Sequence, residues 1–345
     1  MGDMLKERGY ATACFGKWHL GDEERFLPTN RGFDEYFGIP YSNDMAIDPD
    51  MPLADDVKWR KGATAEDFRG GEKQGGWVPL FRNEEVIEYP ANQSTLTKRY
   101  TREAVRFIRE NRDNPFFLYV PHTMPHVPLY ASEEFRGKTE RGLYGDIMEE
   151  LDWSTGRILE TIQELGKDRE TLVIFTSDNG PWLSKGEAGG SQGPLRNGKG
   201  TTYEGGVRVP CLMRWPGVIP PGHVCTEPCG TIDMLPTFAA ITGAQLPTDR
   251  IIDGENILPL MTGERAKSPH DSYYYYSGNS QIHAVRQGDW KFREVEKPEL
   301  YNLREDISEQ NNLAEVHPEK VKQMRQDMRD FDRELKKNRR SPGKI

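Results

Sequence analysis

Short apolar runs alternate with amphipathic segments along the first 245 residues. Residues 10–15, 115–120 and 171–176 are apolar runs, which predict β-strands buried on both faces. Apolar positions at helical spacing within residues 94–112 and 143–165 predict two helices. Helices that alternate with such strands indicate parallel βαβ units covered on both sides. We therefore expect a mostly parallel α/β sheet flanked by helices.

The pattern changes after residue 245. Short runs rich in β-favouring residues at 273–278, 284–293 and 300–303 predict an antiparallel meander, and residues 318–337 predict a closing helix with one apolar stripe. We expect two domains. Residues 1–245 form an α/β catalytic domain, and residues 246–345 form a smaller antiparallel-sheet subdomain with a terminal helix.

Polar side chains directly follow each of the three predicted buried strands. They are Lys17 and His19, then His122 and His126, then Asp178 and Asn179. Ligands of open parallel sheets bind beyond the carboxyl ends of the strands, so we expect these residues to meet at one edge. The glycine-rich segment 195–206 presents Lys199 between two glycines, which permit close backbone approach to a ligand.

These residue types suit the hydrolysis of a phosphate or sulfate ester. The lysines provide a local positive focus for a tetrahedral oxyanion, and Asp178 and Asn179 offer hard oxygen ligands for Ca²⁺ or Mg²⁺. A histidine beside the anion could protonate a leaving alkoxide, and we rank His126 ahead of His122. Each residue also has an ordinary interpretation: a turn at 178–180, a packed His19, a solvated Lys199.

Composition narrows the functional classes. The chain has 345 residues and a formal net charge of −9, which argues against a general nucleic-acid binder. No apolar run approaches the length of a membrane span, and the first residues lack the pattern of a secretory signal. The four cysteines lack zinc-finger spacing, so we expect packed thiols or one disulfide among Cys211, Cys225 and Cys229.

Several longer motifs occur together and in a specific order. They are Gly16–Gly21, residues 32–44, residues 115–119 followed by Pro125-His126, residues 177–180, residues 198–206, and residues 300–303 with 311–313. Over essentially its whole length the chain resembles the type I, formylglycine-dependent sulfatases of the arylsulfatase A kind. The resemblance implies an alkaline-phosphatase-like fold and selects a sulfate ester over a phosphate ester.

The resemblance also implies roles for individual residues. They are sulfate-binding Lys17 and Lys199, His19 bonded to the nucleophile, the leaving-group acid His126, the calcium ligands Asp178 and Asn179, and Ser42 lining the pocket. Ca²⁺ is then expected ahead of Mg²⁺, and the partner is a sulfated small molecule or glycan. Family habit points to an exported protein, whether periplasmic, secreted or lysosomal.

One part of the family's active site has no counterpart in this sequence. The family's nucleophile is a formylglycine made from the cysteine of a Cys-x-Pro/Ala-Ser-Arg motif, and none of the four cysteines here has that context. The acidic pair that completes the calcium site is also missing, since we assign Asp55-Asp56 to a loop. We therefore expect an N-terminally truncated sulfatase that is inactive alone.

Two rival interpretations remain open. The first is a metal-dependent phosphatase or phosphodiesterase of the same fold, which would need a Ser or Thr nucleophile and more acidic ligands. The second is a degenerate sulfatase that binds a sulfated glycan without hydrolysing it.

Overall fold

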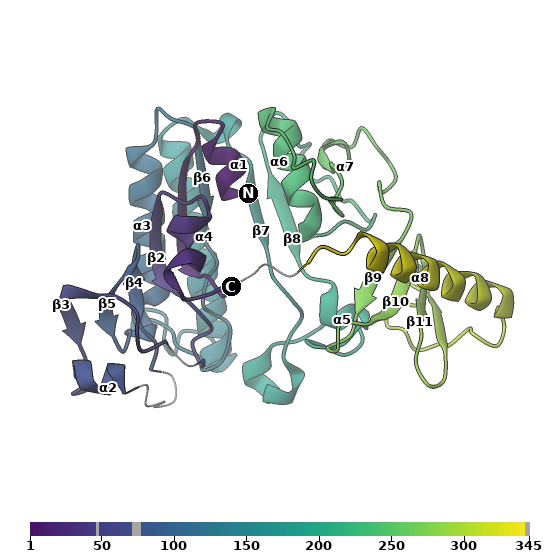
Figure 1. The fold of residues 1–345 in the computed structure, drawn as a ribbon, viewed down its shortest axis with the longest axis horizontal. Helices are drawn as coiled ribbons and strands as arrows, with labels where there is room; N and C mark the ends of the chain where they lie inside the picture. The colour runs from purple at the N-terminus through teal and green to yellow at the C-terminus, as the bar shows by residue number, and fades with distance from the viewer. Residues whose placement is uncertain (46–47, 71–76, 342–345) are drawn as a thin grey trace. The chain divides into compact units, whose positions relative to one another are not determined.

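The computed structural model describes residues 1–45, 48–70 and 77–341 (Figure 1). The chain forms two compact units. Unit 1 comprises Met1–Thr171 with Ile241–Leu246, and unit 2 comprises Leu172–Ala240 with Pro247–Ile345. The assignment of separate domains on either side of residue 245 stays a prediction.

A six-stranded sheet forms the centre of unit 1. Its strands are β1 (Ala11–Lys17), β2 (Glu35–Ile39), β3 (Leu53–Trp59), β4 (Leu80–Arg82), β5 (Glu85–Tyr89) and β6 (Phe116–Tyr119), in the order β3-β5-β4-β2-β1-β6. β1 runs parallel to both β2 and β6, and β3 runs parallel to β5. β4 is antiparallel to its neighbours. The predicted mostly parallel sheet is thus confirmed, with one antiparallel strand.

The helices of unit 1 are α1 (Gly2–Lys6), α2 (Ala65–Arg69), α3 (Leu96–Glu110) and α4 (Gly142–Glu164). α3 packs on β1 and β2, and α4 packs on α3. The predicted apolar stripe of α3 is buried as expected, with Tyr100 and Ala104 at 0% exposure. These side chains join Phe15 and Phe37 of the sheet in one core cluster. Burial of this face, more than local propensity, holds the helix in place.

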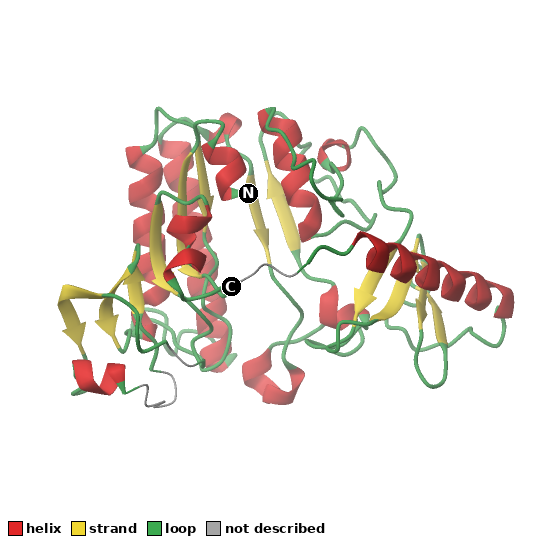
Figure 2. Cartoon of the chain, in the orientation of Figure 1, coloured by secondary structure: helices red, strands yellow, loops and turns green. Residues whose placement is uncertain are grey.

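Unit 2 contains two smaller sheets (Figure 2). β7 (Val173–Thr176) pairs antiparallel with β8 (Cys211–Arg214). The strands β9 (Tyr273–Tyr276), β10 (Ile282–Gln287), β11 (Trp290–Arg293) and β12 (Glu299–Asn302) form the predicted antiparallel meander, in the order β12-β11-β10-β9. The helices are α5 (Glu204–Val207), α6 (Met234–Thr242, whose end enters unit 1), α7 (Leu258–Thr262) and α8 (Pro318–Asn338). Short 3₁₀ segments occupy Glu24–Phe26, Pro28–Arg31, Gln93–Thr95, Asp168–Glu170, Leu183–Gly189 (with a kink at Gly186) and Thr231–Asp233.

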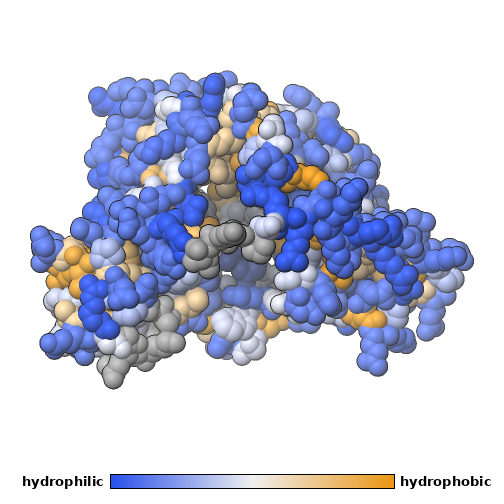
Figure 3. All heavy atoms as spheres, in the orientation of Figure 1, coloured by the Kyte–Doolittle hydropathy of each residue, from blue (hydrophilic) through white to orange (hydrophobic). Residues whose placement is uncertain are grey.

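The closing helix covers the meander as its pattern predicted. α8 lies along β10 and β11, and its buried Val321, Met324 and Met328 pack on Phe292 (Figure 1). Phe331 of α8 stacks on Tyr274 with ring centroids 3.8 Å apart. The charged remainder of the helix faces water, in keeping with the largely hydrophilic face seen in Figure 3.

Three expectations are corrected. Residues 171–176 were assigned to the parallel sheet, but β7 pairs antiparallel with β8. Asp55 and Asp56 lie in β3 and not in a loop, because β3 ends the sheet order and a terminal strand can expose charged residues. All cysteines are free thiols, and only Cys14 is packed, because Cys211, Cys225 and Cys229 lie at exposed positions.

At the carboxyl end of β1, the backbone at glycine residues lies directly against the backbone of the neighbouring segments, with no side chain between them. A Cβ atom on Gly38 would lie 1.8 Å from the carbonyl oxygen of Gly16, and a Cβ atom on Gly16 would lie 2.0 Å from that of Pro121. Both distances are far below van der Waals contact. Glycine at these positions therefore lets β1, β2 and the segment after β6 approach one another.

We expect Gly38→Ala to lower the free energy of unfolding by at least about 2 kcal/mol, because the added methyl forces the paired strands apart. The matched control is Gly156→Ala in α4, where nothing lies within 4 Å of the new Cβ and stability should rise by up to about 1 kcal/mol. Urea unfolding followed by circular dichroism measures both. Equal midpoints for the two variants would contradict the steric argument.

Candidate functional site

The first group of predicted site residues lies at the carboxyl end of β1 in unit 1. Three successive backbone N–H groups fix this segment: Lys17 donates to Pro121 O at 2.7 Å, Trp18 to Ile39 O at 3.0 Å, and His19 to Pro40 O at 2.8 Å. His19 adopts a left-handed φ of 62°, which is uncommon for a residue other than glycine and recurs at functional sites. Its ring packs edge-on against Tyr41 at 5.8 Å.

Ser42 and His126 come together from different loops. Ser42 is buried, and its Oγ lies 3.3 Å from Nδ1 of His126. The Asn43 side chain donates to Pro128 O at 3.0 Å, which ties the segment after β2 to the segment after β6. Because β1, β2 and β6 are parallel neighbours, the structure brings Lys17, Ser42 and His126 to one edge of the sheet.

The bonds of His126 assign its tautomer. Nδ1 lies 2.7 Å from the carbonyl oxygen of Val127. A carbonyl oxygen can only accept, so Nδ1 carries a hydrogen and donates it to Val127. Nε2 is then the ring nitrogen through which His126 would exchange a proton with a ligand. The expected acid role requires a second proton, carried on Nε2 of the imidazolium form.

His122 occupies a different environment from His126. Its Nε2 lies 3.3 Å from the Ser154 hydroxyl on α4, while its Nδ1 is closed off from water without a hydrogen-bond partner among the described residues. Burial lowers the pKa of His122 to about 4. A neutral ring turned into the helix layer suits anchoring of the loop better than proton delivery, which supports ranking His126 ahead of it.

The second group lies in unit 2, where two turns pack together. Gly180 N donates to Gly206 O at 3.0 Å, and Lys199 N donates to Pro181 O at 2.8 Å. A Cβ atom on Gly180 would lie 1.8 Å from Gly205 O, so only glycine fits there. The Asp178-Asn179 turn and the loop that carries Lys199 therefore form one backbone-bonded unit. The ammonium of Lys199 lies 5.0 Å from the centroid of the Trp182 ring, within cation–π range.

The predicted residues are thus assembled as two groups, one in each unit. Lys17, His19, Ser42 and His126 form the first, and Asp178, Asn179 and Lys199 form the second. Their union in one pocket stays a prediction.

The donor set for calcium is small. In the part of the chain that the structure describes, no three His, Cys, Asp or Glu side chains are grouped to hold a metal ion. Ca²⁺ takes six to eight oxygen ligands, and the one carboxylate and one amide of residues 178 and 179 fall short of that number. These residues do not make a calcium site by themselves, and no chemical step is assigned to a metal here.

A charged network below the Lys199 loop was missed by sequence reasoning. It includes Lys291 and Arg293 on β11, with Lys291 at 0% and Arg293 at 5% exposure. No local signal marks it, because the alternation in the strand Trp290-Lys291-Phe292-Arg293 places two cations on one face of the sheet, a pattern typical of a face exposed to water. Inward charges in a strand are expensive unless paired, and they mark a built network.

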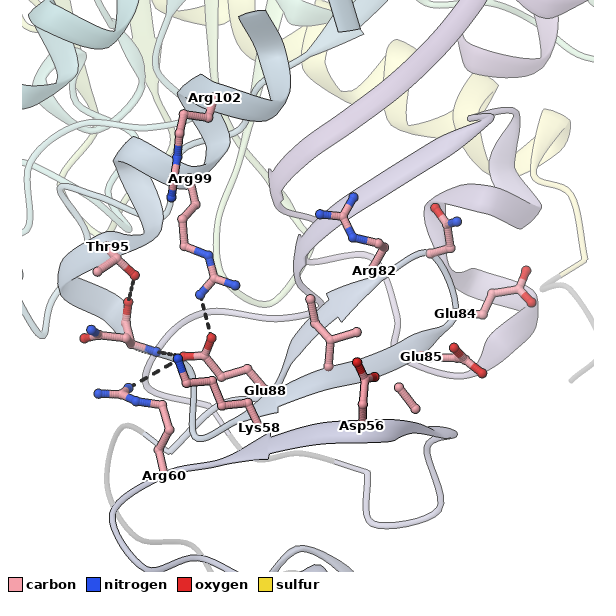
Figure 4. Close-up of a pocket in the computed structure, with 14 residues that line it drawn as sticks. Asp56, Lys58, Arg60, Arg82, Glu84, Glu85, Glu88, Thr95, Arg99 and Arg102 are labelled. Atoms are coloured by element: carbon pink, nitrogen blue, oxygen red, sulfur yellow. Dashed lines mark hydrogen bonds and ion pairs between the residues drawn. The ribbon is translucent and has the colours of Figure 1, made fainter. Parts of the chain in front are cut away.

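A cavity of about 980 Å³ in unit 1 lies apart from the predicted residues. It is lined by Ala54, Asp56, Lys58, Arg60, Arg82, Asn83, Glu84, Glu85, Ile87, Glu88, Asn92, Thr95, Arg99 and Arg102. Figure 4 shows Glu88 between Arg60 and Arg99, at 3.7 and 2.7 Å. Because its five basic side chains are accompanied by four acidic ones, the cavity lacks the concentrated positive charge that a sulfate ester requires.

Known proteins resemble both parts of the chain. Residues 1–244 match the family profile "Sulfatase", and residues 197–339 match "N-sulphoglucosamine sulphohydrolase, C-terminal". The chain is 38% identical to steryl-sulfatase from Mus musculus over 338 residues, which cover 83% of this chain and 54% of that protein. It is 40% identical to arylsulfatase A from Homo sapiens over 298 residues, which cover 84% and 57% respectively. The chain thus spans about half the length of these curated relatives.

A solved structure shares the fold. The crystal structure of Ps i-CgsB in complex with k-i-k-neocarrahexaose superimposes with a TM-score of 0.80 at 30% identity, over 96% of this chain and 73% of that chain. Among the described residues, no helix is long and apolar enough to cross a membrane.

The depressed pKa of His122 predicts a pH-dependent stability. The unfolded ring binds a proton near pH 6.5 and the folded ring only near pH 4, so stability should fall as the pH drops through that window, by at most about 3 kcal/mol. His122→Gln keeps a partner for Ser154 but cannot titrate, and it should flatten this loss. Chemical unfolding at pH 7, 5.5 and 4.5 tests it; parallel curves for wild type and variant would contradict it.

Proposed function

Because the chain belongs to the sulfatase family, we propose that it serves in the hydrolysis of a sulfate ester of an aryl alcohol or a carbohydrate. The family match confirms the predicted resemblance, and with it the alkaline-phosphatase-like α/β fold with a C-terminal antiparallel subdomain. The observation that carries the proposal is the parallel pairing of β1 with β6, which brings Lys17, His19 and His126 to one edge of the sheet.

Each residue is proposed to act through its own chemistry. Lys17 and Lys199 hold the sulfate oxygens, since an ammonium donates to several oxygens of an oxyanion. His126, when it is protonated on both ring nitrogens, donates the Nε2 proton to the leaving oxygen while its Nδ1–H stays bonded to Val127 O. His19 hydrogen-bonds the nucleophile, and Ser42 lines the pocket beside His126.

The sequence supplies only part of a metal site and no residue for the family's nucleophile. Asp178 and Asn179 would supply two of the oxygen ligands of a Ca²⁺ ion, which would neutralise charge near the sulfate when bound. No cysteine of these 345 residues has the Cys-x-Pro/Ala-Ser-Arg context of a formylglycine. We therefore propose that these residues bind the ester but do not attack it by themselves.

The substrate class rests on similarity. Relatives named steryl-sulfatase and arylsulfatase A support an aryl or steryl ester, and the hexaose complex of Ps i-CgsB supports a carbohydrate. We also propose an exported protein, following family habit; fractionation of source cells that finds it only in the cytoplasm would refute this.

We expect the purified 345-residue chain to show no turnover of 4-nitrophenyl sulfate above the buffer rate, with or without added Ca²⁺. The reason is that the family's attacking aldehyde has no precursor in this sequence. Release of 4-nitrophenolate is followed by absorbance. Sustained release that scales with protein concentration would show that another residue supplies the nucleophile.

We expect the same chain to bind 4-nitrophenyl sulfate, with affinity reduced roughly 10- to 100-fold by Lys199→Met or Lys17→Met, because each removes a charge-assisted hydrogen bond. Lys297→Met is the control, since this lysine is 82% exposed. Titration calorimetry provides the dissociation constants. Equal affinities for all four proteins would contradict the assigned roles, whereas tight binding that depends on both lysines would equally suit the non-catalytic glycan-binding alternative.

A further inference from the structure

The loop that presents Lys199 is held on both sides by β12 and by the segment that follows it. On one side Arg196 donates through Nη1 to the carbonyl oxygen of Glu309 at 2.5 Å and to the Tyr301 hydroxyl at 3.1 Å. On the other side the backbone N–H of Glu204 donates to the Glu309 carboxylate at 2.7 Å. A single residue, Glu309, thus contacts both ends of the segment that contains Lys199.

A buried ion triad holds the Glu204 end of the Lys199 loop. The Lys291 ammonium lies 2.8 Å from Oε1 of Glu204 and 3.0 Å from Oε1 of Glu309. The exposures of Lys291, Glu204 and Glu309 are 0%, 1% and 0%. The ammonium also lies 4.6 Å from the centre of the Tyr275 ring. All three groups are therefore removed from water. The one ammonium lies between two carboxylates, and Arg208 and Arg286 each approach Oε2 of Glu204 to 3.7 Å.

A second contact fixes the residue between the loop and the triad. Tyr203 lies between two guanidinium groups, with Arg293 at 3.4 Å and Arg196 at 4.2 Å from its ring centroid. Its hydroxyl donates to the Glu299 carboxylate at 3.1 Å. The ring and the hydroxyl of Tyr203 are therefore both held by neighbouring charged side chains.

The backbone of Glu309 is itself strained. It has a left-handed φ of 51°, a conformation that residues other than glycine adopt at an energetic cost. In this conformation its carbonyl faces Arg196 while its carboxylate reaches Glu204 and Lys291. Buried ion networks are poor stabilisers compared with apolar packing of the same volume, but they fix one arrangement of their partners.

We propose that Glu309 and Lys291 are positioning residues that fix the Lys199 loop for ligand binding, an inference that rests on the proposed function of Lys199. Lysine is a flexible side chain, so the placement of its ammonium depends on a fixed backbone. Lys199 is exposed at the top of the loop, while residues 202, 204, 205 and 206 below it are buried. β11 and the segment after β12 thus support Lys199, a binding residue that precedes them in the chain.

The test compares Glu309→Gln and Lys291→Met with the exposed control Lys297→Met in the full 345-residue chain. Hydrogen exchange of the amides of residues 196–206, measured by mass spectrometry, should become at least tenfold faster in the first two variants. It should not change in the control. Unchanged exchange in both variants, with circular dichroism showing a folded chain, would overturn the proposal.

A double variant separates positioning from stability. Lys291→Met/Glu309→Met replaces the ammonium and one of its two carboxylate partners by apolar side chains. The remaining Glu204 keeps Arg208 and Arg286 at 3.7 Å, so the melting temperature should recover toward that of the wild type. Exchange of residues 196–206 should stay fast, and affinity for 4-nitrophenyl sulfate should stay about tenfold weaker. Recovery of exchange and affinity together with the melting temperature would show that the triad only stabilises the fold, and would overturn the proposal.

The two proposals can fail separately. If the wild-type chain does not bind 4-nitrophenyl sulfate, or if Lys199→Met does not change its affinity, the proposed function fails. The exchange data still show whether Glu309 and Lys291 hold residues 196–206 in place. If Lys199→Met weakens binding but the Glu309 and Lys291 variants do not, the function stands and the positioning role is refuted.

Discussion

Backbone-to-backbone contact at glycine is the constraint on which both groups of site residues depend. In unit 1 the carboxyl ends of β1 and β2 touch through Gly16 and Gly38, and that contact aligns the segment of Lys17 with the loops of Ser42 and His126. In unit 2 Gly180 presses on Gly205, which fixes the Asp178 turn against the Lys199 loop. Any side chain at these points would separate the strands or turns. Main-chain contacts thus fix the positions of the functional loops, and therefore of the side chains that these loops carry.

The sequence predicted those elements whose burial follows a simple period. The stripes of α3 and α8 and the strands around residues 116–119 and 273–276 occur where apolar spacing placed them. It did not predict the pairing of β7 with β8, because an apolar run indicates burial but does not name its neighbour. Asp55-Asp56 was misassigned for a related reason, since a strand at the end of a sheet can expose charges that a central strand cannot.

Site residues that follow the end of a strand could be predicted from the sequence, whereas the supporting residues elsewhere could not. Lys17, His19 and His126 follow apolar runs, so the rule that ligands bind at carboxyl ends selects them. Glu309 and Lys291 follow no such rule. Their importance depends on contacts with residues about 90 to 110 positions away along the chain, which no local pattern encodes. The sequence ranks His126 ahead of His122, and the coordinates add the physical difference between them, because the same proline-rich loop turns one ring toward Ser154 of α4 and bonds the other to Val127.

The buried network explains why a protein would keep charges where apolar residues would stabilise it equally well. Removing one partner of a buried ion pair typically costs about 3–5 kcal/mol, whereas replacing all partners by apolar groups is often neutral. Stability alone therefore gives no reason for Lys291 to lie between Glu204 and Glu309. A requirement for one loop conformation does, because directional bonds reach both Arg196 and Glu204 from a single residue, and apolar contacts would permit the loop to shift. In a chain of net charge −9, a lysine that must attract an anion gains most from a backbone that cannot move.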